Sequence, residues 1–197
     1  MKTKTKALAL ALCAVLLVVS TVFVTMAYLT SEDSVTNTFT VGKVTITLDE
    51  ADVDLMGVKD GDARVKANKY KLIPGHTYIK DPTIHVAGDS ENCWLFVKVE
   101  NGLKDIIDAK TIEDQLVDNG WYLVDDETNI YAYEDIATAK IKDYKVFDDF
   151  KLKGSADVSL YENAKIVVTA YAIQADGFAT AAAAWAEAPS DWETPAN

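Results

Sequence analysis

Two histidines, His76 and His85, are the side chains best suited to acid–base or metal chemistry in this sequence. A catalytic zinc site needs three protein ligands, and two of them often come from an H-E-x-x-H pattern on one helix. Here His76 follows a Pro-Gly pair, His85 lies in a run typical of a strand, and there is no third histidine. We therefore predict no metal ligands. A His76/His85 site completed by a nearby carboxylate stays open as an alternative.

Cys93 lies in the apolar run CWLFVKV, which predicts a small buried core side chain. A reactive thiolate needs electropositive and partly exposed surroundings, which this run does not offer. The other cysteine, Cys13, belongs to an apolar leader, so the mature chain has no partner for an internal disulfide; intermolecular pairing of Cys93 is the alternative. The sequence also has no G-x-S-x-G elbow and no phosphate-binding glycine motif. It predicts no catalytic residue, no enzyme activity and no cofactor.

An acidic stretch, Asp49–Lys69, is the other candidate for ligand chemistry. Its aspartates surround Gly57 and Gly61 and are Asp52, Asp54, Asp60 and Asp62. Their spacing fails the EF-hand pattern, which requires ligands at regular odd positions and a terminal glutamate. We interpret the stretch as a solvated loop or irregular excursion, with a weak cation site as the alternative.

The net charge of the chain limits the classes of molecule that it can bind. The formal net charge is −12, and removal of residues 1–27 would take away three lysines and no acidic residue. Such a chain should be repelled by nucleic acids and by anionic lipid surfaces. We therefore expect no nucleic-acid partner.

The first residues have the three parts of a secretory signal. Met1–Lys6 is basic, Ala7–Met26 is apolar, and the small residues Thr25 and Ala27 flank a predicted cut before Tyr28. The apolar run approaches the ~20 residues that span a bilayer, so a retained anchor is the alternative. Polar residues follow at once without a basic stop-transfer cluster, which favours cleavage. We therefore assign residues 1–27 to a signal-peptide helix that contacts the membrane only before cleavage.

Residues 28–50 begin polar and then alternate. Phe39 and Val41 share one parity, and the phase changes at Gly42, where a bulge or sharp bend is expected. This divides the stretch into an arm, residues 28–41, that could pair with another strand, and a core strand. The core strand, Lys43–Leu48, should face the interior with Val44, Ile46 and Leu48.

The same stretch resembles the start of the TasA/camelysin-like proteins of Gram-positive bacteria. The residues that carry the resemblance fall in one order: Tyr28; Thr30, Ser31, Glu32 and Asp33; Asn37-x-Phe39; Gly42; and Val44-x-Ile46-x-Leu48-Asp49-Glu50. It extends more loosely over Leu72–Val99 and the C-terminal IVVTAYAIQADGF.

This resemblance implies a jelly-roll-like β-sandwich exported through a SipW-type signal peptidase to the cell surface or extracellular matrix. TasA-like members polymerise into biofilm-matrix fibres by donating an N-terminal strand to the next subunit. The implied partners are further copies of the same chain and accessory matrix proteins. Camelysin-like relatives carry a protease label, but no zinc motif is present here.

The body, residues 42–188, shows no internal repeat or linker and is expected to be one mainly β, antiparallel domain with one or two short helices. Its predicted strands are Thr77–Val86 interrupted at Pro82, a central strand Cys93–Glu100, a hairpin of Trp121–Val124 with Ile130–Glu134, Tyr144–Leu152, and a mid-sheet strand Lys165–Ala175. The helices are expected within Leu103–Asn119, capped by Thr111 and Asp114 and ended by Gly120, and between Phe178 and Trp185. Residues 189–197 are expected to be a frayed tail.

The sequence thus predicts a secreted structural protein that polymerises by strand donation. Two alternatives stay open: a monomeric surface adhesin or binding module that uses the Ala51–Asn68 stretch or an exposed Trp192 region, and a metalloprotease. An arm that pairs within its own molecule needs the same alternation as a donated one, so the sequence does not separate them.

Overall fold

The computed structural model describes residues 3, 5, 6, 11–17, 43–108, 110–139 and 143–192. The chain divides into two compact units, Met1–Thr40 and Val41–Asn197, and each is considered by itself. In the first unit residues 11–17 are helical and exposed. None of the helices in the described ranges is both long and apolar enough to cross a membrane. The predicted cleavage and arm residues lie outside these ranges: Thr25, Ala27, Tyr28, Asn37, Phe39, Val41 and Gly42.

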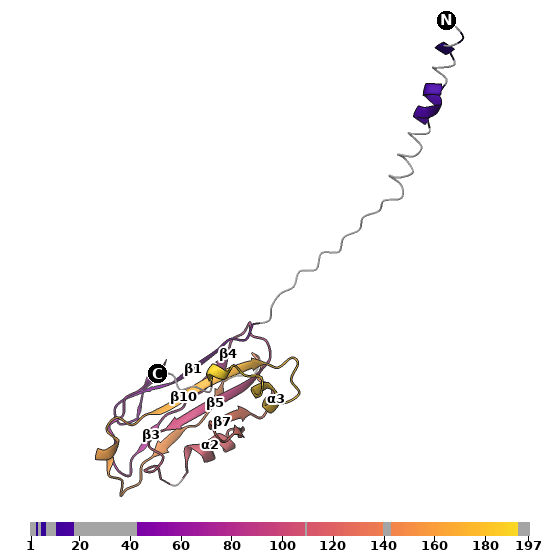
Figure 1. The fold of residues 1–197 in the computed structure, drawn as a ribbon. Helices are drawn as coiled ribbons and strands as arrows, with labels where there is room; N and C mark the ends of the chain where they lie inside the picture. Colours follow the sequence, from indigo (N-terminus) through magenta and orange to yellow (C-terminus); the bar gives the residue numbers. More distant parts are fainter. Residues whose placement is uncertain are drawn as a thin grey trace. The chain divides into compact units, whose positions relative to one another are not determined.

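The second unit is mainly β, and all of its described strand pairs are antiparallel (Figure 1). One four-stranded sheet has the order β2-β1-β4-β8, formed by Lys59–Val65, Ile46–Val53, Thr83–Val86 and Tyr144–Lys145. The other has the order β10-β5-β7-β6, formed by Ile166–Gln174, Cys93–Asn101, Ile130–Tyr133 and Trp121–Asp125. A two-stranded ribbon pairs β3 (Thr77–Ile79) with β9 (Asp149–Lys151). The predicted antiparallel β-sandwich is confirmed.

The main core lies between the two sheets. It buries Ile84 of β4 against Leu95 and Val97 of β5, and includes aromatic side chains such as Phe147 and Phe150. Burying large aliphatic and aromatic side chains on facing sheets is the principal source of stability in a sandwich. This core therefore joins the two sheets into one domain.

A second apolar cluster covers the opposite face of the sheet that contains β5. Trp94 and Phe96 alternate with the main-core residues along β5, so they point to this other face and pack under Trp185 of α3 (Ala181–Trp185). The prediction that β5 is a central strand covered on both faces at one end is confirmed, because it pairs with β10 on one side and β7 on the other and is fully buried from Cys93 to Val97.

The acidic stretch is a hairpin, so its prediction as a loop is wrong. β1 continues past Leu48 to Val53, and β2 returns along it. Asp54 closes the turn, since its Oδ1 accepts hydrogen bonds from the backbone N–H groups of Met56 and Val58 at 2.8 and 3.0 Å. Gly57 has φ of +70°, and a Cβ there would lie 2.8 Å from the Cα of Tyr78. The hydrogen bonds of Asp54 and the positive φ of Gly57 thus form a tight turn between two strands, although the acidic composition of the stretch suggested a loop.

Other local predictions are confirmed. Pro74 and Gly75 form a type II turn, with φ of +76° at Gly75 and a hydrogen bond from His76 N to Ile73 O of 3.1 Å. Pro82 separates β3 from β4. α2 (Ile112–Asp118) has the expected capping box, in which Thr111 and Asp114 satisfy each other's backbone N–H groups.

Two strand predictions need correction. The Tyr144–Leu152 run is two short strands in different sheets, β8 and β9, because the intervening Val146 and Phe147 turn into the main core. Lys165–Ala175 was expected in mid-sheet, but β10 lies at an edge and pairs only with β5 among the described residues. The apolar side chains of β10 pack against the main core on one face and against the cluster around Trp185 on the other, and this pattern does not require a second neighbouring strand.

Candidate functional site

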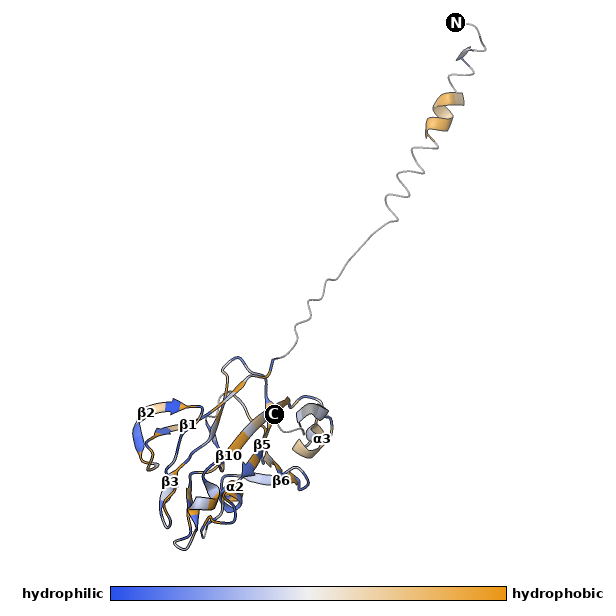
Figure 2. Ribbon diagram, turned by 60° about the vertical axis from the view of Figure 1, so that its left-hand side comes forward, coloured by the Kyte–Doolittle hydropathy of each residue, from blue (hydrophilic) through white to orange (hydrophobic). Residues whose placement is uncertain are grey.

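The free edge of β10 is the most unusual feature of the domain. β10 pairs with β5 over nine residues without a register shift, from Ile166 opposite Asn101 to Gln174 opposite Cys93. No strand pairs with its other side among the described residues. It contains no charged residue, proline or glycine, and Figure 2 colours much of it as hydrophobic. A long, regular, apolar edge is a template on which another strand can form a hydrogen-bonded ladder.

The other edges of the two four-stranded sheets are protected against such pairing. β2 carries Lys59, Asp60, Asp62 and Arg64 and has a register shift against β1. β8 is only two residues long, and β6 has a register shift between Leu123 and Asp125. Charges, short length and bulges are the usual protections of sheet edges. β10 has none of these, which identifies it as the candidate site.

The core is incomplete beside β10. Leu95 and Val97 of the neighbouring β5 are 0% exposed, whereas the side chains of β10 that face the same core are only half-buried. These inward residues are Ile166, Val168, Ala170 and Ala172. Apolar side chains that pack on the core yet keep contact with water lack a covering element among the residues that the structure describes. Addition of a strand beside β10 would remove this apolar surface from water.

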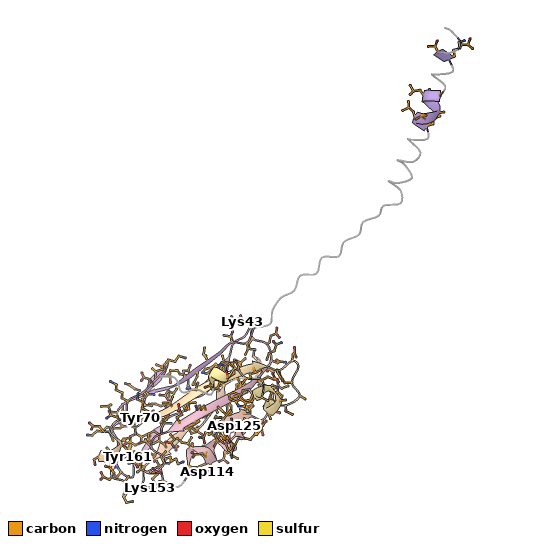
Figure 3. The ribbon with its side chains drawn as sticks, viewed as in Figure 1. Lys43, Tyr70, Asp114, Asp125, Lys153 and Tyr161 are labelled. Atoms are coloured by element: carbon orange, nitrogen blue, oxygen red, sulfur yellow. The ribbon has the colours of Figure 1, made fainter. Side chains whose placement is uncertain are left out.

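An open groove of about 960 Å³ continues from this edge toward β1. It is lined by Ile166, Val167 and Val168 of β10, Leu48–Glu50 of β1, residues 66–70, Leu72, Lys80, Pro82, Leu103, Phe150 and residues 161–165. Tyr70 and Tyr161 mark it in Figure 3, at the end of the domain opposite Lys43. We call it the β10 groove.

The charges of the β10 groove divide into paired and unpaired groups. Glu50 and Lys80 are buried and form an ion pair of 2.5 Å, to which Asn68 adds a hydrogen bond on Glu50. By contrast, three exposed lysines, Lys66, Lys69 and Lys165, have no carboxylate within ion-pair distance among the described residues. Lys66 donates a hydrogen bond to the backbone carbonyl of Leu48, at 2.6 Å. We call these lysines the lysine rim.

A chain of charges crosses the opposite sheet. Arg64 of β2 bonds to Asp49 of β1, and His85 of β4 bonds to Asp49 through Nε2 at 2.9 Å and to Asp143, just before β8, through Nδ1 at 2.6 Å. Arg64 also forms an ion pair with Asp81, in which Nη1 lies 3.3 Å from Oδ2. We call Arg64, Asp49, His85 and Asp143 the charge ladder. It ties together all four strands of this sheet.

The protonation of the ladder follows from its geometry. Partial burial alone would lower the pKa of His85, but the hydrogen bonds to Asp49 and Asp143 outweigh it and raise the pKa above its usual value. Burial likewise opposes ionisation of Asp49, but Arg64 and His85 hold its pKa below the usual range. Both ring nitrogens of His85 face carboxylates, so the protonated ring suits this site.

The remaining reactive residues lie apart from one another. His76 Nε2 is 2.8 Å from the carbonyl oxygen of Met56, a different environment from that of His85. In the described part of the chain no three His, Cys, Asp or Glu side chains gather as a possible metal site. Cys93 is 0% exposed, as predicted for a core side chain, and burial raises its pKa to about 11. A thiol in this state is a poor nucleophile at neutral pH.

Other predicted residues have specific places. Val44, Ile46 and Leu48 are half-buried and pack against the main core, although β1 begins only at Ile46. Trp192 was expected to be exposed, but it is half-buried and stacks on Tyr171 with ring centroids 4.8 Å apart. It therefore covers part of the outer face of β10.

Sequence reasoning missed the open edge and the lysine rim. The available signal was the absence of any charge, proline or glycine in residues 166–174, which the prediction interpreted as a central strand. Searches against protein-family models, curated proteins and solved structures found no match to this chain.

Proposed function

We propose that this protein is a secreted structural subunit of the cell surface or extracellular matrix that polymerises into fibres. Residues 28–41 of one copy, the arm, pair with the open edge of β10 in the next copy. The observation that carries the proposal is the unprotected, nine-residue apolar edge of β10 beside an incomplete core. Strand addition of this kind takes its affinity from main-chain hydrogen bonds and its specificity from alternate side chains.

The sequence of the arm suits this edge. At odd positions it carries Leu29, Val35, Phe39 and Val41, and its even positions from Thr30 to Thr40 are all polar. A strand with this alternation presents one apolar face, which would cover the half-buried side chains of β10. Export and removal of residues 1–27 would place the arm at the new N-terminus, so that processing would precede assembly.

Arm deletion tests this proposal. A chain that begins at Tyr28 should form filaments visible by negative-stain microscopy, and deletion of residues 28–40 should abolish them while circular dichroism stays unchanged. The fold is retained because the described core lies entirely in residues 43–192. The Ile46→Asp variant is the contrasting control, since it puts a charge against the core and should unfold the domain. A chain from Tyr28 that stays monomeric at high concentration would overturn the proposal and favour a monomeric surface module.

A further inference from the structure

We propose that the lysine rim of the β10 groove receives the acidic residues Glu32 and Asp33 of the neighbouring copy's arm, and thereby sets the direction of the donated strand parallel to β10. This inference rests on the proposed function and adds to it the direction of insertion.

Charge is the first argument. The chain as a whole has a net charge of −12, yet the exposed lysines of the rim lie together on one groove and lack carboxylate partners among the described residues. Of the three carboxylates that line the groove, Glu50 is paired with Lys80 and Asp49 with Arg64, which leaves Glu162 without an ion-pair partner among the described residues. The rim thus keeps an excess of positive charge. Complementary charges on two surfaces fix register and speed association.

The position of the rim is the second argument. Lys165 directly precedes β10, so the rim stands at the Ile166 end of the strand. If Asp33 lies at this end, residues 33–41 of the arm match residues 166–174 of β10 in length. A parallel arrangement then sets Phe39 beside Ala172 and Val35 beside Val168. The large ring would meet a small side chain, which suits close packing.

The opposite direction fits less well. It would carry Glu32 and Asp33 to the Gln174 end of β10. Lys43 lies near this end, because the backbone carbonyl of Asn92 accepts a hydrogen bond from Ala175 and the backbone carbonyl of Lys43 accepts one from Glu91. The lysine at that end, Lys43, already faces Asp89 at 3.8 Å. An acidic pair placed there would meet a carboxylate.

Charge reversal tests the inference in a chain that begins at Tyr28. In low salt we expect the E32K/D33K variant and the K69E/K165E variant each to assemble at least about tenfold more slowly, as followed by light scattering. The four-residue combination should recover most of the rate, and ~1 M salt should remove the differences. The K59E/K104E variant, which changes two exposed lysines outside the groove, is the matched control and should assemble normally.

Cross-linking tests the direction. Fibres mixed from ¹⁴N- and ¹⁵N-labelled chains and treated with a carbodiimide should join Glu32 or Asp33 of one copy to Lys69 or Lys165 of another. Intermolecular links to Lys43 instead would show the opposite direction and overturn the inference. Normal fibre growth in both the E32K/D33K variant and the K69E/K165E variant would also overturn the inference. If the unmodified chain forms no fibres, the proposed function fails first, so the two failures are distinguishable.

Discussion

Two edge strands of this domain, β2 and β10, present opposite surfaces to solvent. β2 is exposed along almost its whole length, carries charges of both signs and is irregular in its pairing with β1. β10 is apolar, regular and only half-covered. Figure 2 shows the contrast in colour, with β2 largely hydrophilic. Among the described residues, the edge of the first sheet is protected and the edge of the second is not, and this contrast supports the proposed addition of a strand beside β10.

The two sheets also differ in what holds them together. The sheet with β2 is tied across its outer face by the charge ladder, from Arg64 through Asp49 and His85 to Asp143. The sheet with β10 relies on apolar packing, with the main core on one face and α3 with Trp185 on the other. Each further area of apolar surface that is removed from water adds stabilising free energy, whereas a charge ladder whose groups are already paired gains nothing from an additional strand. The sheet with β10 is therefore the one to which we propose that a strand is added.

The largest expected effect comes from protecting the open edge. The V167K/T169K variant places two charges on β10, on the face opposite the main core, and should prevent fibre formation in a chain that begins at Tyr28. Val167 is already 41% exposed, so the domain itself should keep its circular dichroism spectrum. Ala63→Lys adds a charge to the exposed and already protected β2 and should leave fibres unchanged. Normal filaments from the V167K/T169K variant would show that assembly uses another surface.

A second prediction compares the closed and open parts of the core. Leu95→Ala on β5 removes a fully buried side chain and should lower the free energy of unfolding by about 3 kcal/mol. Val168→Ala on the half-buried β10 should cost only about 1 kcal/mol in the arm-deleted chain. Urea denaturation of both variants measures these values. Equal losses would mean that β10 is already covered, which would remove the basis for strand addition.

The smallest effect concerns the charge ladder. Because the pKa of folded His85 is raised above 6.5, its contribution to stability is complete below pH 6.5 and is lost as the pH rises through the raised value. Asp49 acts in the opposite sense, since its lowered pKa means that its contribution is lost only as the pH falls below 3.8.

The His85→Gln variant should therefore lose about 1 kcal/mol of unfolding free energy near pH 5.5 and progressively less as the pH rises above 6.5. Urea denaturation across this pH range provides the measurement. A pH-independent loss in His85→Gln would show that the ladder acts by packing rather than by charge.

The sequence by itself determined the local structure of this protein. The Pro74-Gly75 turn, the Thr111–Asp114 capping box and the buried strand at Cys93 each depend on neighbouring residues or on the alternation of side chains, which are visible in the chain. The mainly β antiparallel sandwich follows from the number of such strands. In the acidic stretch a local signal was also present, at Asp54 and Gly57, but the composition obscured it.

Only the tertiary structure decided which strands have free edges and which charges meet. Side chains report the layers above and below a strand, so the apolar run of β10 is consistent with both a central and an edge position. Lateral neighbours are bound through backbone groups that every residue shares, and these leave little trace in the sequence. His85 could likewise be recognised as part of a strand, but its carboxylate partners, Asp49 of β1 and Asp143 just before β8, are distant in sequence.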